Sequence, residues 1–281
     1  MLRIVTDGAA DMPPGWGEEF EIKVVPINIH FGEKTYLQGV DLSNEDFYHL
    51  VEESGTIPKT SQPSPHQFTE FYKRIARLGE TILSIHVTSK LSGTYDSAVR
   101  AAGELAQKFQ ILPFDSGCGS AGLGMMCREA RLMERAGATT QQIVSRLVQI
   151  RRNLQIALTL ENLDYARMSG RVGALQAALA SMLNVKPIVV LREGILDVTE
   201  RVRTRSKALA RVLELLRSRF EDEAVHLAAV HARDPQSAKN LLEQAKSIFN
   251  YRDAIMTDLS ISVAANLGPG TVGLVVYPQG E

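Results

Sequence analysis

The sequence predicts an α/β protein in two halves, with a largely parallel sheet in the first and an antiparallel sheet in the second. The chain has 281 residues, which suits two domains of roughly 150 residues each. Short apolar segments alternate with amphipathic helices in the first half, a pattern typical of parallel sheets. A hairpin and closing strands among helices favour an α+β second half. We place the domains at 1–154 and 155–281.

Four strands are expected in the first half. Residues 3–6 form the first, and residues 22–31 alternate in polarity like a half-buried second strand. Pro26 within it indicates a sheet edge, because proline cannot donate a hydrogen bond to a neighbouring strand. Two further apolar segments, 82–87 and 111–114, complete the set.

Helix starts in the first half are marked by capping residues. Ser43 opens one helix, and Ser64 followed by Pro65 opens another, which we expect to end at Gly79. The second of these helices has apolar residues at helical spacing, which predicts one buried face. That face consists of Phe68, Phe71, Tyr72, Ile75 and Leu78.

The second half begins with a strand at 156–160, followed by two helical segments that end near residue 183. A hairpin is predicted next, with a turn at Arg192-Glu193-Gly194 between its strands. The other expected elements are the hairpin strands 187–191 and 195–199, helices 205–219 and 236–249 around a strand at 225–231, and closing strands 254–257 and 272–277.

Charge and hydropathy restrict the partners. The 31 Lys and Arg balance 32 Asp and Glu, so there is no general attraction to nucleic acid or to an anionic membrane surface. The N-terminus lacks an apolar run of signal-peptide length, and Val172–Val185 is too short and too polar to span a bilayer. We therefore expect a cytoplasmic protein without integral membrane association. Since only 6% of residues are aromatic, its core or cavity is expected to be aliphatic.

Metal and nucleotide sites are not expected. Cys118 and Cys127 are too few for a disulfide scaffold or a four-ligand zinc site, and His226 and His231 lie on opposite faces of one strand. Gly117–Gly122 has the glycine spacing of a dinucleotide fingerprint, but the helix predicted at 139–152 stands where a second strand with an acidic end is required. We interpret these glycines as permitting close packing, and expect no cofactor.

One basic run stands out, at the start of the helix predicted from residue 205. A solvated helix start is the favoured interpretation, and a docking patch for an acidic protein partner is the second. A nucleic-acid site lacks both a motif and a basic background. The run consists of Arg201, Arg203, Arg205, Lys207 and Arg211.

Two hydroxyl-rich segments, 59–65 and 88–95, each lead into a predicted helix. The second follows the carboxyl end of a strand, which is where open α/β sheets bind ligands. Helix N-termini offer free amides and a positive dipole end, and hydroxyl groups add donors. Each segment alone is typical of a helix cap, but the pair predicts a site for a carboxylate or phosphate.

Six segments occur in the order and approximate spacing of the DegV family, which the chain resembles over nearly its whole length. The Thr-Ser-Gln-Pro-Ser and Leu-Ser-Gly-Thr elements are together the most specific part of the resemblance. The segments are Thr6–Pro13, Thr60–Pro65, Leu91–Tyr95, Ser169–Val172, Lys186–Ile188 and Gly268–Gly270.

The resemblance implies a two-domain protein that encloses one long-chain fatty acid, such as palmitate, in a tunnel between its domains. By this similarity Thr60 and Ser92 hold the carboxylate. Some family members present the fatty acid to a separate fatty acid kinase, which makes the acyl phosphate for phospholipid synthesis, so the family member is not itself the enzyme. Possible neighbours of the head group are Ser61, Gly93, Thr94, Asn266 and Gly268, and possible partner-surface residues are Arg171 and Arg203.

The chain departs from the family pattern at two positions. Gly8 stands where the family usually has serine, and Asn266 stands where it usually has histidine. Asparagine can donate a hydrogen bond to a carboxylate or phosphate, but it cannot become cationic. Head-group binding is expected to persist, whereas a histidine-dependent role in phosphoryl transfer is not expected from this residue.

Two alternatives remain open from the residues alone. One is a hydrolase or phosphotransferase that uses Ser92, which requires a base within reach. His86, six residues earlier, is the candidate nearest in sequence. The other alternative is a regulatory module that docks through the basic run.

Overall fold

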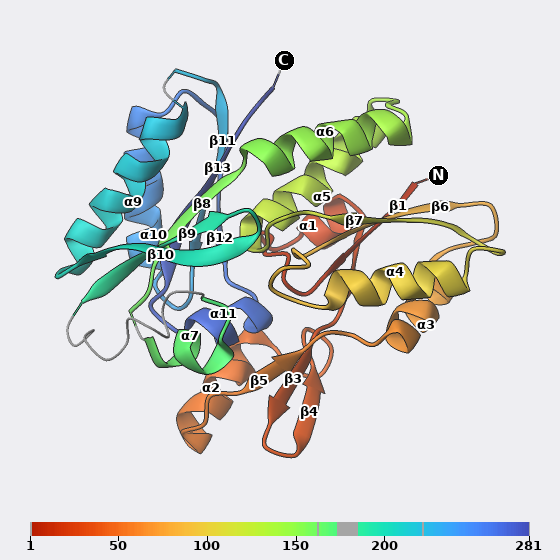
Figure 1. The fold of residues 1–281 in the computed structure, drawn as a ribbon, viewed down its shortest axis with the longest axis horizontal. Coiled ribbons are helices and arrows are strands. Elements are labelled where there is room, and N and C mark those ends of the chain that lie inside the picture. The colour runs from red at the N-terminus through yellow and green to blue at the C-terminus, as the bar shows by residue number, and fades with distance from the viewer. Residues whose placement is uncertain (1, 162, 173–184, 221, 281) are drawn as a thin grey trace. The chain divides into compact units, whose positions relative to one another are not determined.

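The computed structural model describes residues 2–161, 163–172, 185–220 and 222–280. The chain forms two compact units (Figure 1). The first unit comprises Met1–Val148 together with Ser260–Ser262, and the second comprises Gln149–Leu259 and Val263–Glu281. A three-residue segment from late in the chain therefore belongs to the first unit.

A four-stranded parallel sheet organises the first unit, as predicted. Its order is β2-β1-β6-β7, and each neighbouring pair is parallel. The carboxyl ends of the strands consequently lie along one edge, and the loops that follow them start there. The strands are β1 (Leu2–Asp7), β2 (Ile22–Val25), β6 (Thr81–His86) and β7 (Gln110–Asp115).

The single strand predicted at 22–31 is wrong, because the segment forms two strands in different sheets. β2 ends at Val25, and β3 (Asn28–Phe31) lies in a separate antiparallel sheet of order β4-β3-β5. Pro26 separates them, since it has no amide to donate and the chain can leave the first sheet there. β4 (Lys34–Leu37) and β5 (Lys59–Ser61) complete the small sheet.

The predicted caps at Ser43 and Ser64 are confirmed. Ser43 Oγ accepts from Asp46 N (3.1 Å), and Ser64 and Gln67 form a reciprocal capping box. Helices α3 (Pro65–Ile75) and α4 (Thr94–Glu104) pack together on the sheet face that carries Val5 and Ile82. The helices are α1 (Trp16–Glu19), α2 (Asn44–Ser54), α3 (Pro65–Ile75), α4 (Thr94–Glu104), α5 (Ser120–Arg135) and α6 (Thr140–Asn153).

Helix α3 ends four residues before the predicted stop at Gly79. Ala76 is extended, and Leu78, expected on the buried face, is 77% exposed. The reason is a competing local structure: Arg77 N donates to the Glu80 carboxylate (2.9 Å), and that carboxylate also accepts two hydrogen bonds from Arg3. The chain turns toward the start of the sheet instead of continuing the helix.

The second unit contains a six-stranded sheet of order β10-β9-β8-β13-β11-β12. The predicted hairpin is confirmed by the antiparallel pairing of β9 with β10. β12 pairs parallel with β11, which is possible because α10 (Pro235–Ile248) forms the crossover between them. The strands are β8 (Gln155–Thr159), β9 (Lys186–Arg192), β10 (Ile195–Val202), β11 (Val225–His231), β12 (Tyr251–Asp258) and β13 (Val272–Pro278).

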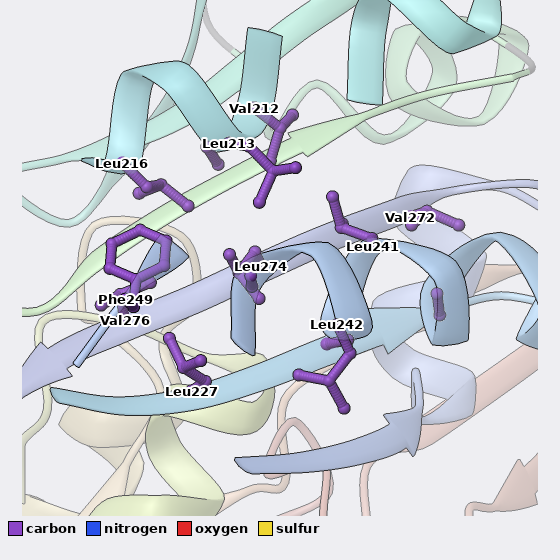
Figure 2. Close-up of a cluster of buried hydrophobic side chains, with 14 of the residues drawn as sticks. Val212, Leu213, Leu216, Leu227, Leu241, Leu242, Phe249, Val272, Leu274 and Val276 are labelled. Atoms are coloured by element: carbon purple, nitrogen blue, oxygen red, sulfur yellow. The ribbon is translucent and has the colours of Figure 1, made fainter. Parts of the chain in front are cut away.

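Figure 2 shows the core of the second unit, where aliphatic side chains of two helices meet one face of this sheet. α9 (Arg205–Phe220) contributes Val212 and Leu216, and α10 contributes Leu241, against Leu227 and Leu274 of the strands. Among the described residues there are two further short helices, α7 (Leu163–Ser169) and α11 (Ile261–Leu267), and the first two residues of α11 belong to the first unit. The second helical segment predicted before residue 183 falls on 173–184, outside the described residues.

None of the helices in the described ranges combines the length and apolar character that crossing a bilayer requires.

Candidate functional site

Ser92 lies in the loop after β6, directly before α4, at the carboxyl edge of the parallel sheet. Its Oγ is 2.8 Å from Thr94 Oγ1 and accepts from Thr94 N (3.3 Å). Gly93 is the N-cap residue of α4 and has no side chain with which to cap the helix. The hydroxyl of Ser92 therefore stands beside the positive end of an eleven-residue helix, where an anion is favoured.

Thr60 and Ser61 point to opposite faces of β5. Thr60 pairs with Ile29 of β3, which is fully buried. Ser61 Oγ lies 2.8 Å from His30 Nε2 and 3.5 Å from Asn28 Nδ2, so its hydroxyl is engaged on the other face. The structure separates these two adjacent hydroxyl groups, and His30, which the sequence analysis did not single out, faces Ser61.

Gln62 brings the two hydroxyl-rich loops together. A Cβ atom built on Gly93 would lie 2.9 Å from Gln62 Nε2, so the Gln62 side chain rests directly on the Ser92 loop. Asn28 Nδ2 donates to Gln62 O (3.1 Å), and Gln67 Nε2 donates to Asn28 Oδ1 (3.2 Å). These two hydrogen bonds fix the segment between Thr60 and α3 against β3, and the Gln62 side chain makes the contact with the loop that carries Ser92.

A row of buried polar groups lies at the centre of the sheet. His86 Nδ1 is 2.9 Å from Asp7 Oδ2, His86 Nε2 is 2.7 Å from Ser84 Oγ, and Ser84 Oγ is 2.8 Å from Tyr72 OH. All four side chains are fully buried. Both ring nitrogens of His86 are thus engaged, and Ser92 Oγ forms its hydrogen bonds with Thr94, which is not a base.

Asn266, Gly268 and Arg171 lie together in the second unit. Ser169 Oγ donates to Asn266 O (3.3 Å), and Arg171 donates through its amide and its Nη1 to Ser169. Gly268 has a φ of 87°, and a Cβ there would lie 2.9 Å from the Tyr165 ring. The end of α7 is therefore fixed against the end of α11.

Arg203 lies at the other end of β10 from Arg171. Val172, the residue after Arg171, forms a β-bridge with Leu196 near the start of β10, whereas Arg203 follows the last residue of that strand and is exposed. Two members of the basic run are paired: Arg205 with Asp234 (2.9 Å), and Arg211 with Glu200 and Glu214. The Glu200 carboxylate raises the pKa of Arg211, and Arg211 lowers that of Glu200. Arg201, Arg203 and Lys207 remain exposed.

The segment from Gly117 to Gly122 forms a tightly packed turn after β7 and then the first residues of α5. Gly117 has a φ of 66°, and a Cβ on Gly119 would lie 3.3 Å from Val87. Cys118 and Cys127 are free and buried, and burial raises the pKa of each thiol to about 12. Within the described ranges, no group of three or more His, Cys, Asp or Glu side chains is arranged to hold a metal ion.

Comparison with known proteins identifies the family. Residues 1–279 match the model of the DegV family, described as uncharacterised proteins. The chain belongs to the DegV family. A DegV domain-containing protein of Halalkalibacterium halodurans is 33% identical, and the alignment covers 98% of each chain.

Two solved DegV structures share the fold over nearly their whole length. A DegV family protein from Thermus thermophilus, described for its fatty acid binding, has a TM-score of 0.90 at 28% identity, with 99% of each chain covered. DegV of Bacillus subtilis, described as a fatty acid binding protein, has a TM-score of 0.86 at 25% identity and the same coverage. The motifs that suggested the DegV resemblance thus lie on a shared fold.

Proposed function

We propose that this DegV family member binds one long-chain fatty acid, with its carboxylate held by Thr60 and Ser92. The observation that carries the proposal is the contact of Gln62 with Gly93, which joins the two predicted anion-binding loops beside the start of α4. Hydroxyl groups and first-turn amides suit a carboxylate without a counter-cation. Related proteins of the same fold are described as fatty acid binding.

The apolar tail supplies most of the binding free energy in this proposal. At about 0.8 kcal/mol per buried CH₂, a 16-carbon chain gains on the order of 10 kcal/mol before entropy losses. The polar contacts then orient the head group and offset its desolvation. Enclosure of the tail in a tunnel between the halves 1–154 and 155–281 stays a prediction of the family resemblance.

We further propose that the protein presents its fatty acid to a separate fatty acid kinase and does not perform the chemistry itself. The proximity of Arg171 and Asn266 supports this, because both residues contact Ser169. Asn266 can donate a hydrogen bond to a carboxylate or an acyl phosphate. Arg171 and exposed Arg203 are the candidates for contact with the kinase.

Mass spectrometry of an organic extract tests the ligand. Protein purified from a bacterial host is expected to carry a stoichiometric C14–C18 fatty acid. Delipidated protein should bind a fluorescent fatty acid, and palmitate should displace it. A protein with no acyl ligand and no affinity for one would contradict the proposal.

A double variant tests the assignment of the carboxylate site. Thr60→Ala with Ser92→Ala should weaken binding by roughly tenfold for each hydroxyl, because each loses a hydrogen bond to a charged group. Ser54→Ala with Thr56→Ala is the matched control, since it removes two exposed hydroxyl groups of the same unit. Equal affinities of the two double variants would remove Thr60 and Ser92 from the site.

Charge reversal tests the presenting role. Arg203→Glu should lower acyl-phosphate formation by a bacterial fatty acid kinase while leaving fatty acid affinity unchanged. Arg171→Glu should lower it as well, and its fatty acid affinity is measured in parallel because Arg171 also contacts Ser169. Turnover of an acyl ester by the protein alone, abolished by Ser92→Ala, would instead support the hydrolase alternative.

A further inference from the structure

The start of α11 is held by side chains from the first fifty residues of the chain. Asp11 Oδ1 accepts from Ser260 N (2.7 Å), and Gln38 Oε1 accepts from Ser262 N (3.1 Å). Ser262 Oγ and Gln38 Nε2 both donate to Gly8 O, at 2.9 and 2.7 Å. These contacts make Ser260–Ser262 part of the first unit.

A helix start needs such partners, because its first amides have no acceptor within the helix. α11 has seven residues and is too short to be stable alone. Asp11 is 2% exposed, and its second oxygen accepts from Ser120 Oγ (2.5 Å), so the carboxylate is fixed before it meets the helix. A fixed carboxylate at the positive end of a helix also stabilises that helix electrostatically.

Gly8 is what allows Gln38 to reach both of its partners. A Cβ atom on residue 8 would lie 2.9 Å from Gln38 Oε1 and 3.0 Å from Nε2. These atoms form the far end of a flexible side chain, so a larger residue at position 8 would displace Gln38 without disturbing the backbone. The hydrogen bond to Ser262 N would be lost with it.

We propose that Asp11 and Gln38, with Gly8 as the space that admits Gln38, are positioning residues that fix the start of α11 and thereby the placement of Asn266 near its end. This rests on the proposed function, in which Asn266, carried by α11, is a candidate hydrogen-bond donor to the head group. Ser169 fixes the other end of the helix through Asn266 O. We call Gly8, Asp11 and Gln38 the α11 clasp.

Amide hydrogen exchange on ligand-free protein tests the clasp directly. Gln38→Met keeps the length of the side chain and removes its hydrogen bonds, and Gly8→Ala displaces the same group. Each should speed exchange at Ser262 by about tenfold, since the amide loses its acceptor. Ser43→Ala is the matched control, because it removes a helix cap elsewhere in the first unit and should leave exchange at Ser262 unchanged.

A double-variant cycle separates the clasp from general damage. In a Gln38→Ala background the atoms that crowd position 8 are absent, so adding Gly8→Ala should change exchange at Ser262 little further. An equal effect of Gly8→Ala in both backgrounds, or unchanged exchange in Gln38→Met, would overturn the proposal.

Fatty acid affinity tests the consequence for the site. Gln38→Met should weaken palmitate binding by about threefold to tenfold well below the unfolding temperature, whereas Ser43→Ala should not. If exchange at Ser262 accelerates while affinity stays at the wild-type value, Gln38 does not position the head-group donor. If the wild-type protein binds no fatty acid, the proposed function fails, and the exchange measurement alone decides whether the clasp holds α11.

Discussion

The buried row from Tyr72 to Asp7 has one arrangement of protons that satisfies every member. Tyr72 donates to Ser84, Ser84 donates to His86 Nε2, and His86 Nδ1 donates to Asp7. In this direction each donor in the row has an acceptor. Burial raises the pKa of Tyr72, so its phenol remains a donor across the ordinary pH range.

The middle of this row should matter more for stability than its end. Ser84→Ala leaves both Tyr72 OH and His86 Nε2 buried without their partner, at about 1–3 kcal/mol for each group. Tyr72→Phe removes only the terminal donor and should cost about 1 kcal/mol. Urea unfolding of the two variants checks the order, and a larger loss for Tyr72→Phe would contradict the assigned direction.

The two cysteines should be inert in the folded protein. Both are buried, and their pKa of about 12 keeps them as thiols at pH 8, whereas the thiolate is the reactive form. Native protein treated with iodoacetamide at pH 8 should gain no adduct by mass spectrometry, and protein in denaturant should gain two. Rapid labelling of the native protein would contradict this burial.

Glu80 should make stability depend on pH in the acid range. Hydrogen bonds from Arg3 and Arg77 hold the pKa of Glu80 at about 2, against roughly 4.3 in the unfolded chain. Its contribution is therefore fully present above pH 4.3 and is lost as the pH falls toward 2. The difference in urea midpoint between wild type and Glu80→Gln should be larger at pH 7 than at pH 3. Equal differences would show that Arg3 does not hold the carboxylate.

At the scale of elements, the early end of α3 leaves Leu78 exposed, so Leu78 should contribute much less to the free energy of unfolding than the buried Leu83 of β6. Leu83 in β6 is fully buried, and Leu83→Ala should lower the free energy of unfolding by about 3 kcal/mol through the cavity it creates. Leu78, at 77% exposure beyond the helix, should change it by less than about 0.5 kcal/mol when replaced by alanine. Chemical denaturation of both variants checks this contrast.

Local signals predicted most of the elements, and long-range contacts decided the rest. The caps at Ser43 and Ser64 and the hairpin of β9 and β10 depend on neighbouring residues, so the sequence reveals them. The early end of α3 depends on Arg3, which lies far from it in sequence. The parallel pairing of β12 also depends on a distant arrangement, because periodicity does not state which strand is its neighbour.

The candidate site shows the same division. The motifs around Thr60 and Ser92 identified two segments, and their contact through Gln62 required the structure. Alternation along β5 separates Thr60 from Ser61, but that inference needs the strand to be known. Asp11 lies in the Thr6–Pro13 motif, which supports the family resemblance but does not assign Asp11 a role. Gln38 lies in no local sequence pattern that sets it apart.

At the scale of the whole molecule, a bound fatty acid should raise thermal stability. A ligand that binds only the folded protein stabilises it by about 2.7 kcal/mol at a hundred times its Kd. Delipidated protein should therefore unfold at a lower temperature than the same protein after palmitate is added. Thr60→Ala with Ser92→Ala should show a smaller rise at the same palmitate concentration, and an equal rise would contradict the site assignment.

The membership of Ser260–Ser262 in the first unit has a consequence for biosynthesis. Translation proceeds from the N-terminus, so Asp11 and Gln38 leave the ribosome long before the amides that they accept from. Those amides appear at residues 260 and 262 of a 281-residue chain. The first unit, although it begins at the N-terminus, therefore acquires these partners only after residues 260–262 have been synthesised.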